Sequence, residues 1–125
     1  MSKHNRPRIA VCHPFGIGLA VATKPSHLEW CRRRFPGADC EPPSSAATMD
    51  IIGSDPASYD VLVWVDRKRP AWRSPRDRAV VAAHEGAHVA KLILDRIGEP
   101  SGTTEVYAYL TDWAAGHIWD ALHGA

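Results

Sequence analysis

The chain has 125 residues, of which 45% are hydrophobic and 23% charged, and its formal net charge is +1. This length fits one compact domain, and the composition excludes overall disorder. The nearly neutral charge predicts neither a nucleic-acid partner nor a membrane surface.

Cysteine usage and hydropathy indicate the compartment. Cys12, Cys31 and Cys40 are odd in number and form no CxxC pair, which favours a reducing environment. The basic start is not followed by an uninterrupted apolar segment, so we expect no signal peptide and no membrane span. The chain is therefore expected to be a single domain over residues 1–125, located in the cytoplasm.

The first half of the chain predicts a small sheet with one helix. The expected elements, in chain order, are a frayed start over 1–7, strands over 8–13 and 17–22, a helix from Ser26 to about Phe35, a loop over 36–58 and a strand over 59–65. The loop is rich in proline and glycine, with a short element expected at 49–52. Connections this long are typical of functional or mobile segments. The clearest strand is YDVLVWV, which is β-branched and almost continuously apolar.

The second half predicts two helices. Ser74 can cap the first one, with Pro75 in its first turn and Asp77 three residues after the cap. Gly98 should end this helix after Ile97. A second helix should run from residue 103 or 104 to about 122. The expected fold class is therefore α+β, a small β-sheet packed by helices with a C-terminal helix pair.

The stretch VVAAHEGAHVAKL lies in the first of these two helices and contains H-E-x-x-H. His84 and His88 are four residues apart, so they share one helix face and can take two corners of a tetrahedral Zn²⁺ site. Glu85 lies about 100° around the helix, from where it can reach a metal-bound water as general base. The flanking residues are small and uncharged, as a dry metal site requires. The alternative is a helix with two incidental histidines.

A catalytic zinc site needs a third protein ligand. Lys91 and Leu94 occupy the positions where metzincins carry glycine and a third histidine, which excludes that class. The remaining candidates are Glu99, Glu105, Asp112 and His117. Simple antiparallel packing favours Asp112, whereas Glu105 needs a steep helix crossing or a turn that folds back. Acids also favour the first turn of a helix without binding any metal, so the residues alone leave Glu105 and Asp112 open.

The second-helix stretch TTEVYAYLTDW resembles the signature of gluzincin-type metallopeptidases, in which a glutamate is the third ligand and a small residue follows three positions later. Glu105 and Ala108 match this pattern. H-E-x-x-H followed by E-x-x-A-Y is also similar to minimal gluzincins, to ImmA/IrrE-like proteases and to small HExxH proteins encoded by phages and prophages. The matching residues lie within 74–122.

This resemblance implies a ligand set of His84, His88 and Glu105, with Zn²⁺ as cofactor and Glu85 as catalytic base. It implies that Asp112 holds a ligand histidine by its free ring N–H, and that the strand over 59–65 lies beside the active-site helix, where an extended peptide can add. One departure is Tyr109, which stands where some gluzincins carry an acid.

The leading hypothesis is a small zinc metallopeptidase that acts on a peptide or protein substrate. A second hypothesis is a phage virion or assembly protein, with a phage or host protein as partner and a structural or degenerate zinc site. A third is a nucleic-acid-associated protease, because a basic loop over 66–78 surrounds Trp72. A solvated loop is the favoured explanation of that segment, since the net charge is small.

Overall fold

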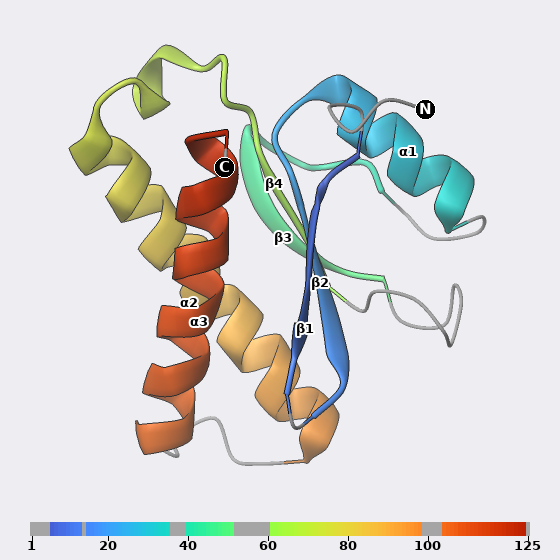
Figure 1. Cartoon of the computed structure of the whole chain (residues 1–125), viewed down its shortest axis with the longest axis vertical. Helices are drawn as coiled ribbons and strands as arrows, with labels where there is room; N and C mark the ends of the chain where they lie inside the picture. Colours follow the sequence, from blue (N-terminus) through green and yellow to red (C-terminus); the bar gives the residue numbers. More distant parts are fainter. Residues whose placement is uncertain (1–5, 14, 36–39, 52–60, 99–103, 125) are drawn as a thin grey trace.

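The structure is a computed structural model that describes residues 6–13, 15–35, 40–51, 61–98 and 104–124. It confirms the α+β class: a four-stranded mixed sheet carries three α-helices, and the two C-terminal helices pack together (Figure 1). The elements are β1 (Arg8–Cys12), β2 (Ile17–Ala22), α1 (Pro25–Arg34), β3 (Ala46–Asp50), β4 (Val61–Val65), a short 3₁₀ helix η2 (Pro70–Trp72), α2 (Pro75–Ile97) and α3 (Thr104–Leu122). Within the described residues no helix is both long and apolar enough to cross a bilayer.

The strands follow the order β1-β2-β4-β3. β1 pairs antiparallel with β2, β2 pairs parallel with β4, and β3 pairs antiparallel with β4. β4 therefore has a neighbour on each side, and β3 is the edge strand on the α2 side of the molecule. The expectation that the strand over 59–65 offers an edge to a peptide is wrong, because β3 and β2 already occupy both of its edges.

The sheet is covered on both faces (Figure 1). Side chains of β2 alternate between them, so that Leu19 and Val21 pack with α2 and α3, whereas Ala20 and Ala22 pack with α1. β4 alternates in the same way. Every residue of both strands is buried, which explains why these strands are continuously apolar rather than alternating in polarity.

The predicted loop over 36–58 contains a strand that the sequence did not indicate. β3 has the sequence AATMD, in which alanine and aspartate are poor strand formers. Its pairing with β4 supplies the main-chain hydrogen bonds, so tertiary context overrides the weak local preference. The short element expected at 49–52 overlaps only the end of this strand.

Helix ends follow the sequence signals for α2 and differ for α1. The Ser74 hydroxyl accepts a 3.0 Å hydrogen bond from the Asp77 N–H, and Gly98 ends α2 with φ of 78°. The sequence predicts that α1 starts at Ser26, but its N-cap is Lys24, because Pro25 takes a first-turn position that suits its fixed φ.

Helices α2 and α3 run antiparallel and approach each other closely at Gly86 (Figure 1). A Cβ atom on Gly86 would lie 3.0 Å from the Thr111 carbonyl oxygen and 3.1 Å from the Ala115 main-chain nitrogen. The missing side chain therefore allows this contact, and it sets which side of α2 faces α3.

Candidate metal site

The two histidines of H-E-x-x-H project from the exposed side of α2. Their Nε2 atoms are 3.2 Å apart, and the His84 side chain is 67% exposed. Two nitrogen ligands of a tetrahedral zinc ion, each 2.0–2.1 Å from it, are separated by roughly 3.3 Å. The pair thus fits two corners of a zinc site, although the same distance also suits a hydrogen bond between the rings.

Glu85 lies between these histidines and the sheet. It is only 4% exposed, and its Oε1 atom accepts a 2.9 Å hydrogen bond from the hydroxyl of Thr48 on β3. Its Oε2 atom lies 3.9 Å from His84 Nε2. A buried carboxylate is costly unless it is hydrogen-bonded. The structure therefore anchors one carboxylate oxygen and places the other beside the histidine pair, as a general base requires.

A groove runs beside these groups, between the start of β3 and the first half of α2. Its volume is about 330 Å³, and its lining includes Ala46, Trp72, Val81, His84 and Glu85. β3 ends the sheet order, so in the described part of the chain one of its sides has no neighbouring strand. The groove thus joins a strand edge to His84 and Glu85.

Helix α3 lies on the other side of α2 from the imidazoles. Gly86 faces α3, and it is two residues from His84 and two from His88, which corresponds to about 200° around the helix in each direction. Within the described ranges, no third His, Cys, Asp or Glu joins the pair in a group that could hold a metal ion. The described residues therefore place no third metal ligand beside the histidine pair.

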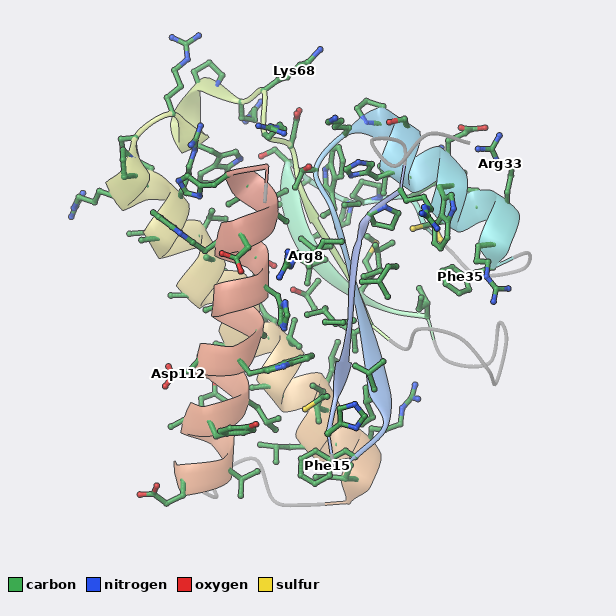
Figure 2. All side chains as sticks on the ribbon, in the orientation of Figure 1. Arg8, Phe15, Arg33, Phe35, Lys68 and Asp112 are labelled. Carbon is green, nitrogen blue, oxygen red and sulfur yellow. The ribbon has the colours of Figure 1, made fainter. Side chains whose placement is uncertain are left out.

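The candidate third ligands lie elsewhere. Glu105 lines a separate hollow of about 260 Å³ together with His13 and Phe15, near the β1–β2 turn. Asp112 is exposed and points away from the sheet (Figure 2). His117 faces β1, where its Nδ1 atom accepts a 3.1 Å hydrogen bond from Arg8 Nε. Glu99 is outside the described residues. Glu105 as third ligand stays a prediction, and it requires the first turn of α3 to approach His88.

The ring of His117 has a perturbed environment of its own. Burial lowers its pKa from the ordinary value, and the nearby Arg8 guanidinium lowers it further, while Asp120 acts in the opposite direction. The hydrogen bond from Arg8 needs a free lone pair on Nδ1, which protonation would remove. His117 is thus held neutral as part of the contact between β1 and α3.

Thr48 is the site residue that the sequence did not reveal. It lies in the segment expected to be a loop, 37 positions before Glu85. Its partner in the β4 register is Val63, which packs into the core shared with α2 and α3. If the strand had been recognised, its alternation would have placed the Thr48 side chain on the face that α2 covers. That placement is the only sign in the sequence that Thr48 can contact Glu85.

The Trp72 side chain in the basic loop is not exposed in a way that would let a nucleic-acid base stack on it. Its side chain is partly buried and packs against the core, and Arg78 Nε donates a 2.7 Å hydrogen bond to its carbonyl oxygen. Its indole N–H is the one buried side-chain N or O atom among the described residues that has no hydrogen-bond partner. The loop thus folds back onto the start of α2, beside the groove.

The chain matches no protein-family model, no curated protein and no solved structure. The resemblance to gluzincin-type peptidases therefore rests on the HEGAH and EVYAY residues themselves.

Proposed function

We propose that the protein is a small zinc-dependent metallopeptidase or related metallohydrolase. The observation that carries this proposal is the placement of Glu85. Its carboxylate is buried and anchored by Thr48, yet one oxygen lies 3.9 Å from a histidine whose partner imidazole is only 3.2 Å away. An incidental pair of surface histidines gives no reason for a buried carboxylate beside it.

In this proposal His84 and His88 would hold Zn²⁺. When bound, zinc would supply a Lewis acid for the peptide carbonyl and would lower the pKa of water at the site. Glu85 takes a proton from the attacking water through Oε2 and returns it to the leaving amine. Thr48 keeps the Glu85 carboxylate in position for both transfers.

The free side of β3 suits an extended peptide substrate. A peptide that added to this edge would gain main-chain hydrogen bonds along the strand, and it would run along the groove that His84 and Glu85 line. Alternate side chains would enter the space beside Trp72 and Val81. This arrangement favours β3 as the substrate strand, in place of the strand over 59–65 suggested by the resemblance.

A second candidate function follows from the position of α3. Because the described residues bring no third donor to the histidine pair, the motif also suits an assembly or interaction protein, for example one from a phage particle, that retains an incomplete zinc site. Such a protein would bind a phage or host protein and would not hydrolyse it.

Glu85→Gln separates the two candidates. The amide keeps the size of the side chain and can accept the Thr48 hydrogen bond, but it cannot take a proton. For the peptidase, cleavage of an unstructured protein substrate by the zinc-loaded chain should fall by roughly 10²–10⁴-fold in the variant, with folding and zinc content unchanged. No cleavage by the zinc-loaded wild type would favour the assembly function. Equal cleavage by both proteins would exclude Glu85 as the base.

A further inference from the structure

A cationic cavity lies at the end of the sheet where the parallel strands β2 and β4 finish. Its volume is about 520 Å³, and its lining includes Arg6, Arg8, Lys24 and Arg67. Lys24 follows the end of β2 closely, and Arg67 follows the end of β4. In open sheets, ligands bind in crevices outside the carboxyl ends of parallel strands, so the position of this cavity is itself typical of a binding site.

In the described part of the chain, much of this positive charge has no counter-charge. Arg8 Nη2 is 3.3 Å from Asp120 Oδ2, which neutralises one of the cations. Lys24 and Arg67 have no ion-pair partner among the residues that the structure describes. Asp66, the acid beside an adjoining hollow of about 310 Å³, accepts a hydrogen bond from the Lys68 main-chain N–H. Like charges gathered around one cavity repel each other, and a bound anion would offset this cost.

The packing of the helices explains the positions of only some of the basic side chains around this cavity. The C-terminal end of a helix attracts positive charge, and both Arg8 and Arg67 lie near the end of α3: a Cβ on Gly124 would be 3.9 Å from Arg67 Nη2. Lys24 is different, because it is the N-cap of α1 and makes no capping hydrogen bond. A cation at that end opposes the helix dipole, so α1 itself gives no reason for a lysine there.

We propose that this cavity binds the phosphate group of a small phosphorylated molecule. Arginine side chains bind phosphate oxygens through paired N–H groups, and the volume lies within the range of roughly 300–1,000 Å³ that is usual for small-molecule sites. The buried His27 also lines the cavity, and its Nδ1 atom accepts a 3.0 Å hydrogen bond from the Thr23 N–H.

The proposal is independent of zinc and of hydrolysis, since the residues that line this cavity and those that line the groove beside His84 do not overlap. It also differs from binding of nucleic acid by the basic loop. Lys68 projects outward from the loop after β4 (Figure 2), whereas a small ligand would be enclosed among Arg8, Lys24 and Arg67.

The test is a titration of the full chain with inorganic phosphate and with adenosine monophosphate, followed by amide chemical shifts in NMR at ionic strength held constant with sodium chloride. We expect saturable shifts at Thr23, Lys24 and Arg67. Arg67→Ala and Lys24→Ala should each weaken binding roughly 10- to 100-fold. Arg69→Ala is the matched control, because Arg69 is exposed in the same loop and does not line the cavity.

Three outcomes would overturn the proposal. The first is an absence of saturable phosphate shifts in the wild-type protein. Attraction to the C-terminal end of α3 would then be the remaining explanation for the positions of Arg8 and Arg67. The second is an equal loss of binding in Arg69→Ala and Arg67→Ala, which would indicate a diffuse charge effect. The third is tight binding of a DNA or RNA oligonucleotide that adenosine monophosphate does not compete away. Circular dichroism of each variant shows that a loss of binding does not reflect unfolding.

Discussion

Thr48 Oγ1 donates a 2.9 Å hydrogen bond to Glu85 Oε1 and thereby joins the edge strand of the sheet to the HExxH helix. The same hydroxyl oxygen is 3.3 Å from the Glu85 carbonyl oxygen, but it has a single hydrogen, which the shorter contact uses. Since Glu85 is buried, this bond both lowers the cost of its charge and fixes the direction of its second oxygen. The strand that would receive a peptide is thus also the strand that orients the proposed base.

Thr48→Val should remove this anchor while keeping the shape of the side chain. The Glu85 carboxylate would lose a charge-assisted donor, so we expect the free energy of unfolding to fall by about 1–3 kcal/mol, and any peptide hydrolysis to fall with it. Urea unfolding and a cleavage assay measure the two effects. Thr48→Ser keeps the hydroxyl and should retain most of both. Full stability in the valine variant would show that the bond contributes nothing.

Gly86→Ala should destabilise the pair formed by α2 and α3. The added Cβ would meet the Thr111 carbonyl oxygen at 3.0 Å and the Ala115 Cβ at 3.2 Å, so the helices must separate, at a cost of about 1–3 kcal/mol in the free energy of unfolding. The matched control is Gly116→Ala in α3, where an added Cβ has no neighbour within 4 Å. That variant should gain up to about 1 kcal/mol from helix propensity. If thermal unfolding gave both variants the same stability, the close approach would be disproved.

Acidification should destabilise the contact between β1 and α3 through His117. Its pKa in the folded state is lowered from 6.5 by burial and by Arg8. Between this lowered pKa and about pH 6.5, the unfolded state therefore binds more protons than the folded state. The stability that this group contributes is present above about pH 6.5 and is lost as the pH falls through the lowered pKa.

His117→Asn isolates this effect, because its amide oxygen can accept from Arg8 Nε and does not titrate. Between about pH 7 and about pH 5, the free energy of unfolding should fall more steeply for the wild-type protein than for the variant. Urea unfolding at each pH gives both curves. Parallel curves would mean that His117 is not held neutral by the fold.

The sequence predicted the elements with strong local signals and failed where tertiary structure decides. Ser74, Pro75 and Gly98 define the ends of α2 in the sequence and in the structure. The sequence did not predict β3, because this segment forms a strand through its pairing with β4 and not through the strand preference of its own residues. Thr48 was missed with it, since a partner 37 positions away leaves no periodic signal.

The third ligand shows the same limit. H-E-x-x-H places two candidate ligands by helical spacing alone, whereas the position of a third depends on how another element packs. Close packing at Gly86 puts α3 against the side of α2 that faces away from His84 and His88, a relationship that neither helix encodes by itself. Glu105 matches the gluzincin pattern, yet it lies beside His13 and Phe15.

Zinc titration of Glu105→Gln and Asp112→Asn tests which acid completes the site. The resemblance predicts that Glu105→Gln weakens zinc binding by at least roughly tenfold, with Asp112→Asn affecting it less. For Glu105 to act in this way, the start of α3 must approach α2 when zinc binds, which a spin-label distance between the two helices would detect. An effect confined to Asp112→Asn would assign the third position to that residue.

The most direct measurement is zinc binding by isothermal titration calorimetry, in which the wild-type protein is compared with His84→Ala and His88→Ala. His123→Ala is the control, because His123 is an exposed histidine that follows the C-terminal end of α3. We expect about one zinc ion per wild-type and control chain, and a loss of this binding in both HExxH variants. Zinc binding that survives unchanged in His84→Ala and His88→Ala would contradict the proposal that these two imidazoles form a metal site.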